Sequence, residues 1–316
     1  MTDDDPSPQR CGPLLLCAGT DPRAAARLAV VAATLLGNRQ AIVLATWQPL
    51  PRAGFDSMTD ALDDTDEDLR DGARRAAMQT ARAAADALDA NGVHVTRELC
   101  PEKPSPWQEI LDVADRFDVG VIVAGTTEDT AARPGTIGRQ ARALAHRAHR
   151  PLLLVPADCT MATDAEPAIF AYDGSPAAAH AVAAAAQLLR PRHAVVASVW
   201  HTASHVVGVA MLAVPDEVVR KGAAGLDEAA RLRAAGQASE AATQLTAHGW
   251  SCEPAAIETS RNVPTAIVGA ADEHDAAIIV TGTRGRSRVA AALLGSNAEA
   301  ILRCAGRPVL LVPPGE

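Results

Sequence analysis

The sequence predicts an α/β protein made of two tandem, doubly wound domains, each built on a five-stranded parallel sheet. Three observations lead to this fold class. The second half of the chain repeats the plan of the first, short apolar runs alternate with helical patterns in both halves, and a glycine-rich loop joins a strand to a helix near the end. Strands that alternate with helices are typical of parallel sheets, because each parallel connection needs a crossover.

The repeat is visible in three pairs of segments that keep their order and spacing. Residues 13–22 have the same plan as 167–176, at an offset of 154. Residues 118–126 match 275–283, and residues 151–156 match 308–313, both at an offset of 157. A chain of 316 residues is long enough for two domains of about 150 residues each. We therefore assign residues 11–157 to the first domain and 166–314 to the second, joined by a polar linker.

The elements of each copy follow from the apolar runs and the helical periodicity. In the first copy we expect strands near 13–18, 41–46, 93–99, 119–124 and 152–155, and helices near 22–36, 66–91, 105–116 and 138–149. In the second copy we expect strands near 167–172, 194–199, 252–258, 276–281 and 308–312, and helices near 176–190, 222–248, 262–273 and 296–305. The first helix of each copy has a clear start, because Asp21-Pro22 and Ser175-Pro176 place a capping side chain before a proline. The apolar stretch 201–215 either lies over the ligand crevice or packs against the other copy.

A glycine loop in the second copy has the order of a phosphate site. Gly282 and Gly285 follow a buried strand, and Gly295-Ser296 precedes the last helix. Glycines let backbone N–H groups approach an anion closely, and the start of a helix adds free amides and the positive end of its dipole. The spacing is not that of a P-loop, since no G-x-x-x-x-G-K-[ST] is present.

These residues resemble the universal stress protein family, whose nucleotide-binding members carry this glycine and serine spacing together with a D-G-S turn after the first strand. Here that turn is Asp173-Gly174-Ser175. The resemblance covers nearly the whole chain as two Rossmann-like domains. It implies that ATP, with or without Mg²⁺, is bound by the glycine loop and Ser296, with Asp173 by the ribose and the backbone of Val199, which ends the second strand, at the adenine.

Two features qualify the resemblance. Asn297 and Ala298 follow the Gly-Ser pair where the family often has Val and then Ser or Thr, so one hydroxyl contact to phosphate is lost while Asn297 stays at the site. In the first copy Gly19 aligns with Asp173, Glu128 with Gly285 and Arg139 with Ser296. A carboxylate at the phosphate position is repulsive. We therefore expect no ATP in the first copy by the family's mode, although an anion could still meet Arg139.

Plainer interpretations stand beside these. Ser296 with Glu299 fits a capping box, and Asp-Gly-Ser is good turn chemistry. Arg284, Arg286 and Arg288 either neutralise phosphate or are merely solvated. His146 and His149 have the spacing of one helix face, but with no third ligand nearby we expect surface or packing roles.

The composition of the chain limits which binding partners and which location in the cell we expect. A net charge of −9 and eight aromatic residues argue against nucleic acid as a partner. The acidic start is unlike a signal peptide, and no apolar run is long enough for a membrane span, so we expect no membrane partner and a cytoplasmic protein. The six cysteines contain no C-x-x-C pair, as expected for thiols in a reducing compartment.

The function expected from these residues is a regulatory or sensing module in the stress response that binds an adenine nucleotide. Cyclic AMP is an alternative to ATP, because the glycine loop recognises a phosphate group without specifying how many phosphates are linked to it. Alternatives from other classes are an enzyme that hydrolyses ATP or transfers adenylyl groups, and a protein-interaction scaffold that needs no nucleotide. No residue suggests a general base, so we expect at most slow ATP hydrolysis. In the family, strands like 151–156 and 308–313 pair domains across a dimer interface. Here the two copies could pair within one chain, which leaves a further homodimer and an unknown regulatory protein partner open.

Overall fold

The structure is a computed structural model, and it describes residues 12–37, 39–47, 63–101, 106–127, 135–159, 163, 165–202, 216–284 and 294–315. Within these ranges, no helix is both long enough and apolar enough to cross a membrane. Residues 203–215, for which the sequence left two placements open, lie outside them.

Each copy has five strands and four helices in the described residues, as expected. The first copy contains, in chain order, β1 (Leu14–Cys17), α1 (Pro22–Leu36), β2 (Ala41–Leu44), α2 (Asp63–Ala90), β3 (Val95–Leu99), α3 (Pro106–Arg116), β4 (Val121–Gly125), α4 (Arg139–Arg147) and β5 (Leu152–Val155). The second copy contains β6 (Ala168–Ala171), α5 (Pro176–Leu188), β7 (His193–His201), α7 (Asp216–Thr246), β8 (Ser251–Thr259), α8 (Val263–Glu273), β9 (Ile278–Gly282), α9 (Ser296–Cys304) and β10 (Val309–Val312). The largest difference from the expected boundaries is at α7, which begins six residues before residue 222.

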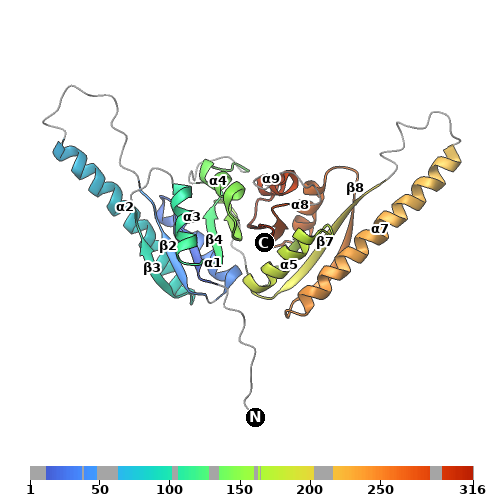
Figure 1. Ribbon diagram of the computed structural model, residues 1–316, viewed down its shortest axis with the longest axis horizontal. Helices are drawn as coiled ribbons and strands as arrows, with labels where there is room; N and C mark the ends of the chain where they lie inside the picture. The colour runs from blue at the N-terminus through green and yellow to red at the C-terminus, as the bar shows by residue number, and fades with distance from the viewer. Residues whose placement is uncertain are drawn as a thin grey trace, which may run out of the picture.

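All ten strands form one sheet, in the order β3-β2-β1-β4-β5-β10-β9-β6-β7-β8. Neighbouring strands are parallel within each copy, whereas β5 and β10 pair antiparallel at the centre, with Leu153 opposite Leu310. The α/β class and the two doubly wound copies are therefore confirmed. Figure 1 shows the result, with the copies side by side, α2 and α7 on the far sides, and α4 next to α9 at the centre.

Two apolar cores lie on opposite faces of this sheet. The inner strands, such as β1, β4, β5, β9 and β10, are mostly apolar and buried because helices cover both faces of the sheet. Leu153 and Leu310 belong to the core covered by α1, α2, α5 and α7. Leu152 and Leu311 belong to the other core, covered by α3, α4, α8 and α9. All four side chains are at most 1% exposed. Each core thus continues from one copy into the other through the central strand pair.

The first helix of each copy starts as the sequence predicts. Asp21 is the N-cap of α1, and its carboxylate accepts hydrogen bonds from the amides of Arg23 (3.1 Å) and Ala24 (3.3 Å). Ser175 is the N-cap of α5, and its hydroxyl accepts one from the amide of Ala178 at 3.1 Å. Such caps satisfy amides that the helix itself leaves without partners.

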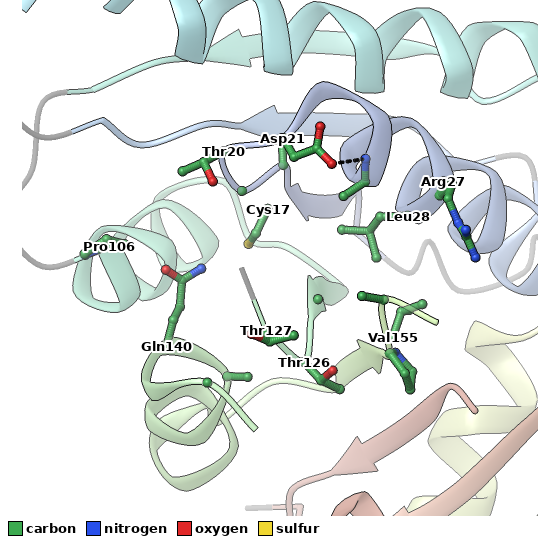
Figure 2. Close-up of a pocket in the computed structure, with 18 of the residues that line it drawn as sticks. Cys17, Thr20, Asp21, Arg27, Leu28, Pro106, Thr126, Thr127, Gln140 and Val155 are labelled. Atoms are coloured by element: carbon green, nitrogen blue, oxygen red, sulfur yellow. Dashed lines mark hydrogen bonds between the residues drawn. The ribbon is translucent and has the colours of Figure 1, made fainter. Parts of the chain in front are cut away.

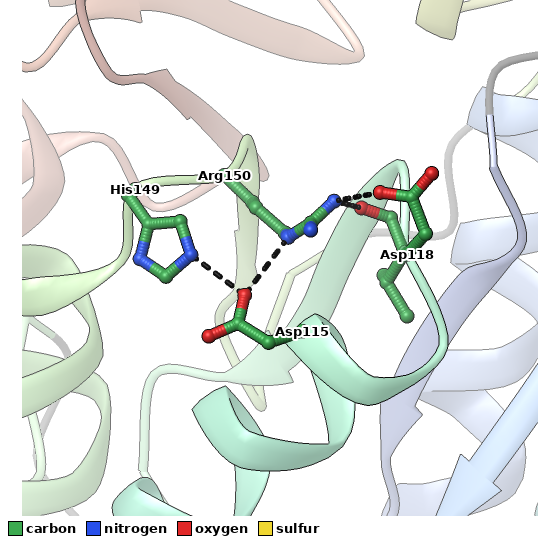
Figure 3. Close-up of polar contacts among 5 residues, drawn as sticks. Asp115, Asp118, His149 and Arg150 are labelled. Atoms are coloured by element: carbon green, nitrogen blue, oxygen red, sulfur yellow. Dashed lines mark hydrogen bonds and ion pairs between the residues drawn. The ribbon is translucent and has the colours of Figure 1, made fainter.

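An arginine anchors the turn before the fourth strand in both copies. In the first copy, Arg150 donates to Asp115 (3.3 Å), to Asp118 (3.0 Å) and to the carbonyl oxygen of Val119 (2.6 Å), and His149 lies 2.7 Å from the same Asp115 oxygen (Figure 3). Partial burial raises the pKa of Asp115. The hydrogen bonds and charge interactions with His149 and Arg150 outweigh that effect, so the pKa lies below its ordinary value.

The second copy repeats this anchor at the same offset as the sequence repeat. Arg307 pairs with Asp272 and donates to the carbonyl oxygens of Ala271 (2.8 Å) and Ala276 (2.6 Å). Asp118 and Asp275 occupy the same left-handed backbone conformation, with φ of 48° in each. The duplication therefore extends to local backbone geometry as well as to the apolar pattern.

The two copies also meet through polar contacts outside the central strands. The amide of Arg190, just after α5, donates to the carbonyl oxygen of Leu35 in α1 at 2.9 Å. On the other face, the backbone amide of Leu294 donates to Nδ1 of His146 in α4 at 3.4 Å. A residue directly before Gly295 is thus held by the first copy, which gives His146 a packing role of the kind expected.

Candidate functional site

The residues predicted to bind nucleotide gather at one edge of the sheet in the second copy. Asp173 lies just beyond β6, Val199 lies near the end of β7, and Gly282 ends β9. β6 lies between β7 and β9, and its two neighbours are reached by connections in opposite directions. Such a switch in strand order opens a crevice at the carboxyl ends of the strands, which is where open α/β sheets bind ligands.

The Asp173 turn is a well-defined loop. Oδ1 of Asp173 accepts a hydrogen bond from the Ser175 amide at 2.9 Å. Gly174 has a φ of +76°, and a Cβ at this position would lie 2.3 Å from the side-chain nitrogen of Gln237. The turn thus needs glycine for both its backbone conformation and the close approach of α7. Plain turn chemistry explains one carboxylate oxygen of Asp173.

Gln237 is a part of the site that sequence reasoning missed. Its Nε2 donates to the carbonyl oxygen of Asp173 at 3.1 Å, and its Oε1 accepts from the hydroxyl of Ser198 on β7 at 3.1 Å. One side chain of α7 therefore ties the end of β6 to β7. The sequence did contain a signal that could have identified Gln237. It is a polar residue within a stripe of buried alanines, between Ala234 and Ala241 on the inward face of α7.

Tyr172 lies beneath this turn and is 3% exposed. Burial raises the pKa of its phenol, and the negative charges of Glu240 and Asp173 raise it further. The phenol is therefore protonated at neutral pH, and Tyr172 contributes packing and a neutral hydroxyl.

Val199 does not end its strand, contrary to expectation. β7 runs on to His201, because β8 pairs with it over its whole length and Val199 lies opposite Ile257. β6 is shorter and ends opposite Ala197, whose carbonyl oxygen accepts from the Tyr172 amide at 3.0 Å. Residues two apart in a strand direct their backbone groups to the same side. The backbone of Val199 therefore faces the crevice beyond the end of β6.

The start of α9 is joined directly to the end of β9. The amide of Gly295 donates to the carbonyl oxygen of Thr283 at 2.8 Å, and the amide of Thr283 donates to Val312 at 2.8 Å. Gly282 also lies in a close corner, since a Cβ there would be 3.1 Å from the Arg284 carbonyl oxygen. This arrangement places the first turn of α9 at the end of β9, the strand that neighbours β6 in the sheet.

The alternative of a capping box at Ser296 is wrong. Gly295 is the N-cap of α9, with φ −64° and ψ 146°, and no side chain caps the helix. Ser296 is instead the first helical residue, and both Ser296 and Asn297 are exposed. The first amides of α9 are thus not occupied by a cap, which is the condition that an anion site requires. Gly285, Arg286 and Arg288 lie outside the described residues.

The corresponding corner of the first copy contains a cavity of about 570 Å³. It lies between α1, α3 and the start of α4, at the carboxyl ends of β1, β4 and β5 (Figure 2). Its polar lining comes mainly from Thr20, Asp21, Arg27, Thr126, Arg139 and Gln140. The sequence had not predicted this cavity.

The turn that borders this cavity differs from its counterpart in the second copy. The left-handed residue is Gly19, with a φ of +66°, where the second copy has Asp173 followed by the left-handed Gly174. The nearby carboxylate of Asp21 caps α1. Glu128, aligned with Gly285, lies outside the described residues.

The described residues show no arrangement typical of nucleophilic or metal catalysis. No group of three or more His, Cys, Asp or Glu side chains is placed to hold a metal ion in this part of the chain. Burial raises the pKa of the thiols of Cys100, Cys159 and Cys252, so these three are protonated and weakly nucleophilic at neutral pH.

Comparisons with known proteins agree with this architecture. The chain resembles a universal stress protein from Archaeoglobus fulgidus, with a TM-score of 0.58 and 16% identity over 97% of this chain and 98% of that one. It also resembles a functionally unknown protein from Pseudomonas aeruginosa, with a TM-score of 0.53 and 18% identity over 96% of this chain and 93% of that one. At such identities these likenesses show the fold alone. No curated protein matches the chain.

A family model provides the stronger finding, because it matches the chain twice and covers nearly all of both copies. The model is described as the universal stress protein family, and it matches residues 15–156 and 166–313. The chain therefore belongs to the universal stress protein family, as a tandem member with two such domains.

Proposed function

We propose that the second copy binds ATP at the corner formed by β6, β7, β9 and α9, and that the chain acts as a nucleotide-responsive regulatory module in the stress response. The observation that carries the proposal is the helix start at Gly295, which has no side-chain cap and is hydrogen-bonded to the end of β9. An uncapped helix start favours an anion through its free amides and dipole.

The phosphates fit the start of α9. Ser296 and Asn297 would hold them through backbone amides, with the Ser296 hydroxyl and the Asn297 side-chain amide exposed nearby. The amide of Gly295 already donates to Thr283, so Gly295 would contribute by leaving the approach free of a side chain. Gly282 lets the chain make a close corner at the end of β9, since a Cβ there would lie 3.1 Å from the carbonyl oxygen of Arg284. Gly285 belongs to the same proposed loop. Mg²⁺, when present, would neutralise part of the phosphate charge.

The nucleoside fits the other end of the corner. Oδ2 of Asp173 has no hydrogen-bond partner among the described residues, so it can accept hydrogen bonds from ribose hydroxyls. The same negative charge would repel phosphate, which orients the nucleotide. The backbone of Val199 would contact the edge of the adenine. Because no described residue is placed as a general base, we infer binding rather than turnover, with at most slow hydrolysis.

The test is calorimetric titration of ATP and Mg²⁺ into the nucleotide-free chain and into Gly295→Asp. The backbone at Gly295 suits an aspartate N-cap, but a Cβ there would lie 3.1 Å from the Thr283 carbonyl oxygen. The capping gain and this close contact oppose each other, so we expect the variant to fold with little change in stability, and Gly295→Ala carries the same contact. The added carboxylate would face the phosphates and weaken ATP binding at least about tenfold. We expect one ATP per wild-type chain.

Two controls separate charge from size and position. Gly295→Ala adds the same Cβ without the charge, so it should retain most of the affinity. Gly138→Asp places the same residue at the matched N-cap of α4 in the first copy and should leave ATP binding unchanged. Equal ATP affinity in wild type and Gly295→Asp would contradict the proposed site, and no binding to folded wild type would contradict the proposed function. Cyclic AMP as a competitor, and phosphate release over many turnovers, would identify the two main alternatives.

A further inference from the structure

We propose that the cavity of the first copy is a second ligand site, for a small organic anion with an apolar body that is not a nucleotide. The cavity volume of about 570 Å³ lies in the range of small-molecule sites. The inference is independent of ATP binding, because it concerns different residues in a different copy.

The anionic end of the ligand is favoured by α4 and two arginines. Gly138 is the N-cap of α4 and provides no side-chain cap, so the first amides of this helix face the cavity. Arg139 is the first residue of the helix, and Arg27 lines the cavity from α1. Among the described residues, neither arginine forms an ion pair with a carboxylate, and Arg27 donates to the carbonyl oxygen of Cys159 at 2.9 Å. Arg139 therefore places one positive charge at the uncapped helix start, and Arg27 adds a second at another wall of the cavity, near Cys159.

A buried polar atom in the cavity indicates that the ligand also carries a hydrogen-bond donor. Oε1 of Gln140 is buried and accepts no hydrogen bond from the described residues. Figure 2 shows this side chain reaching from α4 into the space between Pro106 and Cys17. A buried acceptor without a partner costs about 1–3 kcal/mol. A ligand that carries an N–H or O–H donor beside its anionic group would satisfy it.

The remaining walls suit an apolar body. Leu28 and Val31 of α1, Trp107 of α3 and Val155 of β5 all line the cavity. Trp107 is held by Arg147, whose guanidinium lies 4.7 Å from the ring centroid. The thiol of Cys159 adds no charge, because burial raises its pKa more than Arg27 lowers it. The cavity therefore combines one anion-binding end with an apolar interior.

The nucleotide chemistry of the second copy is missing here. Gly19 replaces the carboxylate that would accept ribose hydroxyls, and Asp21 is engaged in capping α1. In sequence, Glu128 stands where the second copy has Gly285. These differences favour a ligand that needs one anionic group and no ribose contact.

The probe for this site is anilinonaphthalene sulfonate, which carries a sulfonate, an apolar ring system and one N–H donor. We expect one probe molecule per wild-type chain by calorimetry. Energy transfer from tryptophan to the probe should fall in Trp107→Phe while the calorimetric affinity changes little, which places the probe in the cavity.

Matched variants test the anion contact. Gly138→Asp should weaken probe binding at least about tenfold, because it adds a negative charge and a side-chain cap at the start of α4. Arg139→Gln should weaken it about fivefold, because it removes a positive charge there. Arg142→Gln, one turn further along α4 and outside the cavity lining, should leave binding unchanged. Gly295→Asp should also leave it unchanged, and saturating MgATP should not displace the probe.

Three results would overturn the proposal. They are no probe binding to the folded wild type, unaltered binding in both Gly138→Asp and Arg139→Gln, and displacement of the probe by ATP with two ATP molecules bound per chain. The last result would make the cavity a second nucleotide site. Failure of ATP binding in the second copy would instead leave the probe measurements unaffected, so the two proposals can fail separately.

Discussion

The two copies have the same backbone plan but different chemistry at the same corner. In the second copy the turn after the first strand presents Asp173, and α9 begins with Gly295-Ser296. In the first copy that turn has Gly19, and α4 begins with Gly138-Arg139 beside a cavity. The anchors around Arg150 and Arg307 are nearly the same. The comparison teaches that the two copies share their packing and differ at a few residues of one turn and one helix start. We propose that these residues decide which ligand each copy binds.

The largest effect should come from breaking what the copies share. Leu153→Ala removes a fully buried side chain at the central strand pair and should lower the free energy of unfolding by about 3 kcal/mol. Because the cores continue across the pair, hydrogen exchange should accelerate in both β1 and β6. Leu232→Ala, at a side chain that is 56% exposed, is the matched control with little expected effect. Loss of protection in the first copy alone would show that the copies unfold independently.

A smaller effect should distinguish ligand binding in the second copy from ligand binding in the first. Gln237→Ala removes the hydrogen bonds to Asp173 and Ser198 and should weaken ATP binding about tenfold, because the Asp173 turn loses its support from α7. Binding of the sulfonate probe to the first copy should not change. Ser239→Ala, on the exposed side of the same helix, is the control. Unchanged ATP affinity in Gln237→Ala would mean that this turn does not position the nucleotide.

The contact between copies predicts a weaker effect. His146→Ala removes the acceptor for the Leu294 amide, so the loop before Gly295 loses a hydrogen bond to the first copy. We expect ATP affinity to fall about two- to threefold, as for one modest hydrogen bond. His149→Ala, which changes an exposed contact within the first copy, should leave ATP affinity unaltered. A similar loss in both variants would point to a general change in the first copy.

The smallest effect concerns pH and the first copy alone. Since the pKa of Asp115 is lowered in the folded state, its ion pairs stabilise the protein above the ordinary carboxyl pKa and lose that contribution as pH falls through the lowered value. Asp115→Asn should cost roughly 0.5 kcal/mol at pH 7, because the pairs are half exposed. Urea unfolding at pH 7 and below about pH 4 should show the difference shrinking with acid. Asp112→Asn, at an exposed position one turn earlier on α3, should show no such trend.

Much of the fold could be predicted from local sequence, because apolar runs, caps and the repeat are local signals. The caps at Asp21 and Ser175 form as predicted, and the strands fall within a few residues of their expected places. Gln237 could not be assigned to the corner in this way, since it reaches Asp173 across 64 residues of chain. The end of β7 was misjudged because β8 extends the pairing beyond Val199.

The cavity could not be predicted for a related reason. Its walls come from six helices and strands and from the loops beside them, so no single segment of the sequence indicates that a cavity is present. The alignment of Gly19 with Asp173 indicated what the first copy lacks. It gave no sign that Gln140 and Trp107 line the same space, because their proximity depends on how α3 and α4 pack.

The antiparallel pairing of β5 with β10 also decides which sheet edges remain for assembly. A linker of about ten residues keeps the two copies at a high effective concentration, so dilution does not separate them. Each molecule therefore always contains one corner of the first kind and one of the second. The outermost strands are β3 and β8, and both carry exposed charged side chains, such as Arg97 and Glu253. Charged edges disfavour strand addition by another chain. We therefore expect a homodimer of tandem chains to use surfaces other than these edges, in a geometry unlike the strand pairing already present inside each molecule.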